Sequence, residues 1–259
     1  MQLFIFDTET TGLPVNFNSP TTDVHDWPHI VQISGILFDT TTRKTLKCIN
    51  HLIKTSPDID VPPESTKIHG ITKEQTDKDG IPIQIALYLL NHIAKDADVI
   101  IGHNLSFDIK MIEVEYNRNK LFIRSMSNIL LKPHTCTMRL LTQICKIPHK
   151  SKNVKVNVKV SSSNKSTTAT MNYKWPTLSE THHYFFGTIP DGMHNSLIDT
   201  LVCLRCYIYY TDEYDIYGIS EIIQEVEMYD NGGDDNVSTK KIITDYLLPF
   251  NMRSFIQID

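Results

Sequence analysis

The first residues of the chain hold the feature that most constrains its fold, an apolar run that ends in two acids. Residues 3–6 are Leu-Phe-Ile-Phe, and Asp7 and Glu9 follow them. Residues two apart on a strand point to the same face, so we expect both carboxylates to project side by side from a buried strand. Two neighbouring carboxylates repel each other unless a positive charge lies between them. A divalent cation with oxygen ligands, Mg²⁺ or Mn²⁺, would supply that charge. For so short a pattern, a plain strand end followed by a turn at residues 10–12 is the alternative.

Length and composition favour one domain with an extension. The chain has 259 residues, of which 41% are hydrophobic, enough for one core. No run approaches the ~18 apolar residues of a membrane span, and the first apolar run lacks the basic flank of a secretory signal. The five cysteines are scattered, so we expect core thiols and no disulfide framework. We therefore expect an intracellular protein, cytoplasmic or nuclear, with no membrane association.

Strand and helix patterns alternate in a way that is typical of α/β folds. Residues 29–39 and 45–53 predict two strands that form an antiparallel meander with the first strand. Residues 98–102 predict a short buried strand, followed by a helix for which Ser106 is the expected cap. Thr72, with Gln75 three residues later, predicts a capping box for another helix. The order of these elements predicts a mixed sheet.

Two further acids and a histidine lie beside core segments. Asp108 falls in the first turn of the helix after strand 98–102, where an acid alone is explained by the helix dipole. Asp199 lies in the otherwise apolar segment 197–202, and His194 precedes it by five residues. An unpaired buried carboxylate is costly, so a partner such as a metal ion is indicated for Asp199.

Taken in sequence order, these stretches resemble the motifs of the DEDDh exonucleases, the DnaQ-like group of proofreading subunits and stand-alone 3′→5′ exonucleases. Residues 6–12 resemble the first motif, residues 103–108 the second, and residues 194–199 the third. The Ile-His-Gly-Ile-Thr stretch at 68–72 is a further family hallmark, and the match runs from residue 3 to about 210. The resemblance implies an RNase H-like α/β fold, a five-stranded mixed sheet flanked by helices on both faces.

The resemblance also implies phosphodiester hydrolysis by two Mg²⁺ or Mn²⁺ ions per active site, releasing nucleoside 5′-monophosphates. Asp7 is expected to bridge both ions, with Glu9 and Asp199 completing the site of the ion that holds the attacking water. Asp108 is expected to support the second ion, through water. His194 is the expected general base, because imidazoles ordinarily titrate near neutral pH.

The resemblance further implies a set of substrate contacts that follow the first strand: Thr8, Thr10, Thr11, Gly12 and Leu13. The backbone of this segment is expected to hold the terminal nucleotide, with Leu13 wedged near the last base. Asn104 is expected to steady the backbone beside Asp108. The alternative is that these residues serve only the turn and its packing, and the sequence leaves that alternative open.

Charged residues are segregated along the chain. Between Tyr116 and Ser179 there are twelve Lys or Arg and no acids, which suits a surface that follows a phosphate backbone. Residues 149–174 form a basic, polar insertion in an exonuclease domain at 1–210, and whether the insertion binds substrate or is merely solvated stays open. Residues 211–259 form an acidic extension, expected to be helical in part.

The leading hypothesis is a metal-dependent 3′→5′ exonuclease that acts on DNA ends, single-stranded DNA favoured, in proofreading or repair. A 3′→5′ exoribonuclease of the same family is the first alternative, since the motifs do not reveal discrimination against the 2′-hydroxyl. A non-catalytic nucleic-acid-binding or polymerase-associated module is the second. All four carboxylates and the histidine are present, which argues against a non-catalytic module. A polymerase partner or a homodimer is left undetermined.

Overall fold

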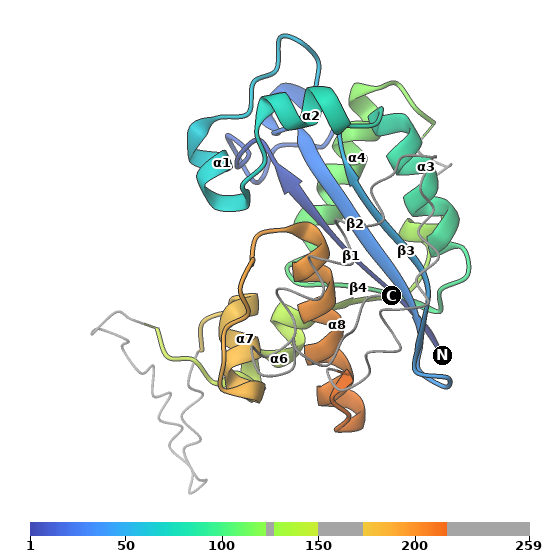
Figure 1. Ribbon diagram of the computed structural model, residues 1–259, viewed down its shortest axis with the longest axis vertical. Helices are drawn as coiled ribbons and strands as arrows, with labels where there is room; N and C mark the ends of the chain where they lie inside the picture. The colour runs from blue at the N-terminus through green and yellow to red at the C-terminus, as the bar shows by residue number, and fades with distance from the viewer. Residues whose placement is uncertain (123–126, 150–172, 217–259) are drawn as a thin grey trace, which may run out of the picture.

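The computed structural model describes residues 1–122, 127–149 and 173–216, and these contain a five-stranded mixed sheet in the order β3-β2-β1-β4-β5 (Figure 1). Strand β1 is central, antiparallel to β2 and parallel to β4, while β3 is antiparallel to β2 and β5 is parallel to β4. The strands are β1 (Gln2–Thr10), β2 (Ile30–Asp39), β3 (Lys44–Leu52), β4 (Val99–Gly102) and β5 (His134–Cys136). The predicted meander and mixed sheet are confirmed.

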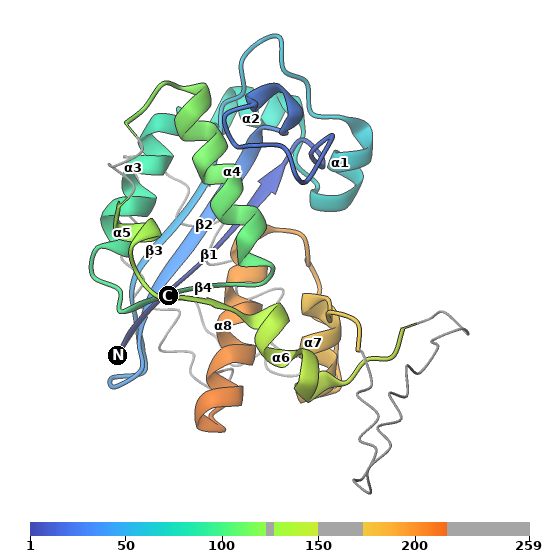
Figure 2. The same cartoon turned by 180° about the vertical axis from the view of Figure 1, so that it is seen from behind.

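Helices cover both faces of the sheet, as predicted. Figure 1 shows α8 in front of the strands. Figure 2 views the molecule from the opposite side and shows α4 in front of the strands. The elements outside the sheet are η1 (Val24–Asp26), α1 (Pro63–His69), α2 (Lys73–Asp79), α3 (Ile83–Ala94), α4 (Leu105–Arg118), α5 (Ser127–Leu130), α6 (Thr137–Cys145), α7 (Leu178–Phe186) and α8 (Ser196–Asp212). In the described residues, no helix has the length and apolar character that crossing a membrane requires.

Residues 3–6 of the central strand are all apolar because they are buried on both faces of the sheet. Phe4 and Phe6 pack into one core with α3 and α4, whereas Leu3 and Ile5 pack into the other with α8. Successive side chains of a strand point to opposite faces, so the odd-numbered residues of β1 face α8. Asp7 and Glu9 continue that odd-numbered series at the carboxyl end of the strand.

Helix starts agree with the sequence where a capping box marks them. Thr72 and Gln75 form the predicted box at α2, and Thr177 forms another with Glu180 at α7. The predicted cap at Ser106 is wrong, because α4 begins at Leu105 after Asn104. Asn104 adopts a left-handed conformation (φ 63°), which asparagine tolerates better than most residues, and it turns the chain directly from β4 into the helix.

The insertion and the extension are only partly within the described residues. Of the predicted insertion at 149–174, residues 150–172 lie outside the described part, as does 217–259 of the acidic extension. The five cysteines are all free thiols, and Cys203 and Cys206 are on the buried face of α8. The expected core position is confirmed for these two and for Cys48 and Cys145, whereas Cys136 is half-buried.

Candidate active site

Three carboxylates meet at the carboxyl end of β1. Asp7 and Glu9 extend from β1, and Asp199 reaches them from the first turn of α8. One ligand oxygen from each of the three lies within 4.8 Å of the others. All three side chains are half-buried, which leaves the cluster open to solvent on one side. The structure thus brings together three of the four carboxylates that the sequence nominated as metal ligands.

The fourth carboxylate, Asp108, is tied to the same strand from the opposite face. It lies in the first turn of α4 and is only 3% exposed. Its Oδ1 accepts hydrogen bonds from the Thr8 backbone N–H at 3.1 Å and from the Thr8 hydroxyl at 2.7 Å. Because Thr8 separates Asp7 from Glu9 in β1, this pair of bonds fixes Asp108 beside the other acids.

A buried polar network holds the start of α8 against the sheet. The Ser196 hydroxyl lies 2.6 Å from that of Ser34 on β2, and the Ser196 N–H donates to Gln32 Oε1 at 3.2 Å. Asn50 on β3 accepts from both Gln32 and Ser34 at 2.9 Å. Satisfied buried networks of this kind are rigid. Asp199, three residues after Ser196, is thereby held in register with Asp7.

His194 precedes α8 and contacts Asp199 through its backbone. The His194 N–H donates to Asp199 Oδ1 at 3.2 Å and to Oδ2 at 3.3 Å. His194 has a left-handed backbone conformation (φ 69°), which costs a non-glycine residue on the order of 1 kcal/mol. The residue as a whole is exposed. His194 is therefore an exposed residue whose main chain is fixed to Asp199.

Burial raises the pKa of every carboxylate in the cluster, and repulsion by neighbouring acids adds to the rise for Asp7, Glu9 and Asp108. The pKa of Glu9 rises to about 9, through burial first and then through Asp199 and Asp108. Burial raises the pKa of Asp108 and of Asp199 to about 7, and that of Asp7 well above its ordinary value. In the described ranges, no lysine or arginine forms an ion pair with these acids.

The donor set fits a hard divalent cation. It consists of carboxylate oxygens only, which are the ligands that Mg²⁺ and Mn²⁺ prefer. The Asp7, Glu9 and Asp199 oxygens converge, and the only hydrogen bonds to these three carboxylates within the described residues come from the His194 N–H to Asp199. Acids that repel one another and lack a compensating cation are what a metal site looks like before the ion binds.

The predicted substrate contacts lie at the end of β1 and on the loop that follows. Thr8 is occupied by Asp108, and the Thr10 hydroxyl donates to the Gly12 carbonyl at 2.7 Å. Leu13 is 75% exposed, next to the carboxylates in sequence. Asn104 lies in the turn before Asp108, on the other side of β1. Their contacts with substrate stay predictions.

Two histidines complete the surroundings of the cluster. His69, from the 68–72 stretch to which the sequence assigned no role, lies near Thr10 and His194, and its Nδ1 accepts from the Ile71 N–H at 3.0 Å. In the sequence, only the position of His69 within the 68–72 stretch indicated that it could belong to the site. His103 bonds the Thr137 hydroxyl and the Pro176 carbonyl, both at 3.0 Å, and burial lowers its pKa to about 4. His103 therefore joins elements as a neutral side chain.

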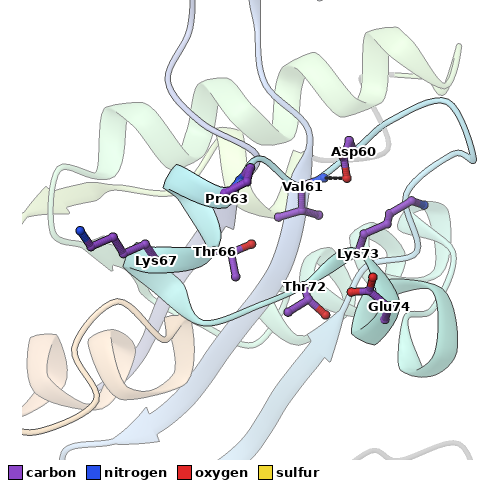
Figure 3. A pocket seen from close by; sticks show the side chains of 8 residues that line it. All are labelled: Asp60, Val61, Pro63, Thr66, Lys67, Thr72, Lys73 and Glu74. Carbon is purple, nitrogen blue, oxygen red and sulfur yellow. Dashed lines mark hydrogen bonds between the residues drawn. The ribbon is translucent and has the colours of Figure 1, made fainter.

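A separate cavity of about 430 Å³ lies between α1 and α2 (Figure 3). Its lining carries both signs of charge, Asp60 and Glu74 with Lys67 and Lys73. The Lys73 ammonium is engaged by the Asp77 carboxylate at 2.6 Å. The cavity includes none of the clustered carboxylates, so it is distinct from the candidate active site.

A protein-family model described as Exonuclease, of the RNase T type, matches residues 4–207. The chain belongs to this family. The matched region contains all four carboxylates and His194, and the assignment confirms the resemblance to the DEDDh, DnaQ-like exonucleases. Membership in the exonuclease family makes the protein a nuclease. A search of curated proteins gives no match.

Solved structures of exonuclease I share the fold of this exonuclease-family chain. The Escherichia coli enzyme in complex with a dT13 oligonucleotide is 13% identical with a TM-score of 0.55, covering 80% of this chain and 41% of its own. The complex with dA16 is 14% identical with a TM-score of 0.55, covering 82% of this chain and 41% of its own. The enzyme from Methylocaldum szegediense is 16% identical with a TM-score of 0.52, covering 82% of this chain and 41% of its own. The chain thus spans about two-fifths of the length of these proteins. At these identities the likeness confirms the RNase H-like fold.

The raised pKa values predict an unusual pH dependence of stability in metal-free protein. When the pKa of a carboxyl group is higher in the folded than in the unfolded protein, the free energy of unfolding falls as pH rises from about 4 towards the folded-state pKa. Replacing one of the carboxylates by a neutral side chain should reduce this loss of stability. We expect Asp7→Asn to raise the melting temperature of metal-free protein by roughly 2–5 °C at pH 8.5, and by less at pH 5.

Thermal unfolding with and without Mn²⁺ measures this effect. Mn²⁺ should stabilise the wild type and not Asp7→Asn, because a ligand stabilises the state that binds it. Asp79→Asn, at the exposed end of α2, serves as the matched control. An Asp7→Asn protein that is less stable than the wild type at pH 8.5 without metal would contradict the electrostatic account.

Proposed function

We propose that this protein is a metal-dependent 3′→5′ exonuclease that removes nucleotides from the 3′ ends of DNA. The observation that carries the proposal is the convergence of Asp7, Glu9 and Asp199, with Asp108 beside them, in a member of the exonuclease family. The exonuclease I structures with dT13 and dA16 support a DNA strand as the substrate. We take a single strand as the preferred form.

The carboxylates are proposed to hold two Mg²⁺ or Mn²⁺ ions. Asp7 would contact both, since it lies centrally in the cluster, with Glu9 and Asp199 on one and Asp108 on the other. When bound, such ions neutralise the phosphate and the leaving oxygen and acidify a water molecule. The chain's contribution is to fix Asp108 through the Thr8 hydroxyl and Asp199 through the His194 N–H, with the bond between Ser34 and Ser196 holding the start of α8.

His194 is proposed to be the general base. It would accept a proton from the attacking water on a ring nitrogen while the water oxygen bonds to phosphorus. The bond from phosphorus to the 3′-oxygen of the preceding nucleotide would then break, and that oxygen would take a proton from solvent while His194 returns its own to solvent. The products would be a nucleoside 5′-monophosphate and a shortened strand with a new 3′-hydroxyl. The exposure and the fixed backbone of His194 support this role, because a base must be both accessible and positioned.

The loop after β1 is proposed to receive the terminal nucleotide. Thr10, Thr11 and Gly12 lie directly after Glu9, so a nucleotide on their backbone places its phosphate at the carboxylates. Leu13 is an exposed apolar side chain that suits contact with the last base. Asn104 is proposed to keep the turn into α4 in the shape that presents Asp108.

The role of His194 predicts a loss of turnover without a loss of binding. We expect His194→Ala to lower kcat by about 10²–10⁴-fold with KM changed little, since a general base contributes that much to the chemical step. His183→Ala, an exposed histidine on α7, is the matched control. Steady-state kinetics at pH 7.5 measures the effect, and wild-type turnover in His194→Ala would refute the assignment.

The polarity and substrate of the reaction are tested with matched 5′-labelled single strands of DNA and RNA. We expect a ladder of progressively shorter labelled DNA in Mg²⁺ or Mn²⁺, none in EDTA, and none with Asp7→Ala. Asp79→Ala should behave as the wild type. A ladder on RNA alone would replace the DNA assignment with an exoribonuclease. Immediate release of the labelled 5′ nucleotide would contradict the 3′→5′ direction.

A further inference from the structure

We propose that Arg118, at the carboxyl end of α4, is a positioning residue for the terminal nucleotide. It fixes the shape of residues 11–29, which we call the substrate loop and which joins β1 to β2. The inference rests on the proposed function, because the loop carries Thr11 and Leu13 at the candidate active site. In the sequence, Arg118 is one of the twelve basic residues between Tyr116 and Ser179 that suit a surface following a phosphate backbone. In the structure its side chain is instead largely buried and paired with Glu115.

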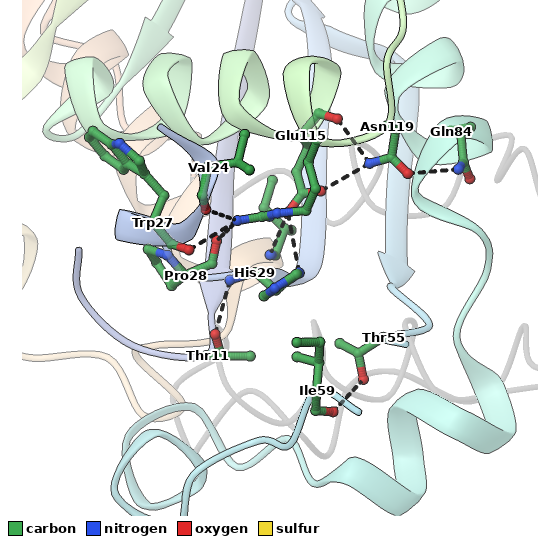
Figure 4. A network of polar contacts seen from close by, with 12 residues as sticks. Thr11, Val24, Trp27, Pro28, His29, Thr55, Ile59, Gln84, Glu115 and Asn119 are labelled. Carbon is green, nitrogen blue, oxygen red and sulfur yellow. Dashed lines mark hydrogen bonds and ion pairs between the residues drawn. The ribbon is translucent and has the colours of Figure 1, made fainter. Parts of the chain in front are cut away.

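Arg118 binds three main-chain carbonyl oxygens of the substrate loop. Its Nη2 donates to the carbonyl oxygens of Val24 and Trp27, both at 2.9 Å, and of Pro28 at 3.1 Å, so its two N–H groups are shared among three acceptors (Figure 4). The planar guanidinium directs Nη2 to the loop while Nη1 faces Glu115, a fixed fork that the single ammonium of lysine does not reproduce. The three carbonyls therefore converge on one side chain that defines their relative positions.

Glu115 holds the guanidinium in place from one turn earlier in α4. The Arg118 Nη1 and the Glu115 Oε1 form an ion pair, and the two side chains are 16% and 4% exposed. Glu115 also accepts from the Ile30 N–H at 3.4 Å and from the Asn119 amide at 3.2 Å (Figure 4). A buried charge pair needs such additional partners to be stable. The pair thus joins α4 to the start of β2 as well as to the loop.

The position of Arg118 is transmitted to Thr11 through His29. The His29 N–H donates to the Thr11 hydroxyl at 2.9 Å, and the Thr11 N–H donates to the His29 carbonyl at 2.8 Å (Figure 4). The Ser65 hydroxyl, from α1, donates to the Thr11 carbonyl at 2.8 Å. Arg118 binds the carbonyl of Pro28, and the adjacent His29 binds Thr11. The guanidinium is therefore connected through these two residues to Thr11, which precedes Gly12 and Leu13.

The substrate loop is held rigid although it exposes apolar side chains. Leu13, Val15 and Phe17 are 75%, 84% and 52% exposed. Lys110 of α4 donates to the Phe17 carbonyl at 3.0 Å, next to this group. An ordered loop that presents three apolar side chains beside a catalytic cluster fits a surface for nucleotide bases. Preorganising it lowers the cost of ordering when substrate binds.

The effect of Arg118 is separable from the catalytic carboxylates. Asp108 lies on the same helix ten residues earlier, about 15 Å along its axis. Asp108 is fixed by Thr8 and not by the loop. Loosening the substrate loop should therefore weaken substrate binding and leave the chemical step intact. A role for Arg118 in stability alone would change neither KM nor kcat of the folded protein.

Two variants test the proposal against a matched arginine control. Arg118→Lys keeps the charge beside Glu115 and removes the fork. The double variant Glu115→Met, Arg118→Met removes both charges together, so that neither is left buried without a partner. Arg43→Met alters an arginine stacked 3.7 Å from the Tyr214 ring centroid, in the turn between β2 and β3 at the far end of the sheet.

The measurement is steady-state hydrolysis of a labelled single-stranded oligonucleotide, with thermal unfolding to establish that each variant is folded. We expect KM to rise about 10-fold in both Arg118 variants with kcat within about 3-fold of the wild type, and no change in Arg43→Met. Wild-type KM in either folded Arg118 variant, or a fall in kcat at constant KM, would overturn the proposal.

The design separates this inference from the proposed function. If the wild type hydrolyses no strand, the proposed activity fails, and equilibrium binding of the same oligonucleotide in EDTA then tests Arg118 independently. Weaker binding by both variants, with Arg43→Met unchanged, would still support the positioning role. Equal binding by all four proteins would overturn it.

Discussion

The repulsion among four carboxylates at one end of β1 is the constraint on which the rest of the structure depends. Asp7 and Glu9 are placed together by the alternation of a strand, and α4 and α8 add one acid each. Each is held by specific partners: Asp108 by Thr8, and Asp199 by the His194 N–H and the buried serines at the start of α8. Keeping like charges close reduces the stability of the fold, and a divalent cation between them would offset that cost.

Helix α4 links the chemistry to the substrate. Its first turn supplies Asp108, and its last turns supply Glu115 and Arg118, which fix the loop that follows β1. The same rigid element thus sets where the carboxylates lie and where the terminal nucleotide is proposed to lie. A binding site gains from such a shared element, because a preorganised substrate loop lowers the cost of ordering when substrate binds.

Features with local causes were predictable from the sequence, and features with distant causes were not. The apolar run before Asp7 and the capping box at Thr72 each follow from neighbouring residues, and both are confirmed. The Ser106 cap was wrong because a left-handed Asn104 replaces an ordinary cap. The contacts of Arg118 left no trace, since its acceptors are main-chain carbonyls that every residue has. The bond from the Thr8 hydroxyl to Asp108, a hundred residues away, was not predicted either, and the contact of Thr8 with substrate stays a prediction.

The most direct test of the central claim is a calorimetric titration of Mn²⁺ into metal-free wild type and Asp7→Asn at pH 7.5, in two buffers of different ionisation enthalpy. The account predicts that the wild type binds Mn²⁺ and releases protons, because the cation displaces protons from carboxyl groups whose pKa is raised. Binding to Asp7→Asn should be at least about 10-fold weaker. Equal Mn²⁺ affinity in the two proteins, or no binding by the wild type, would contradict the claim that this cluster exists to hold a divalent cation.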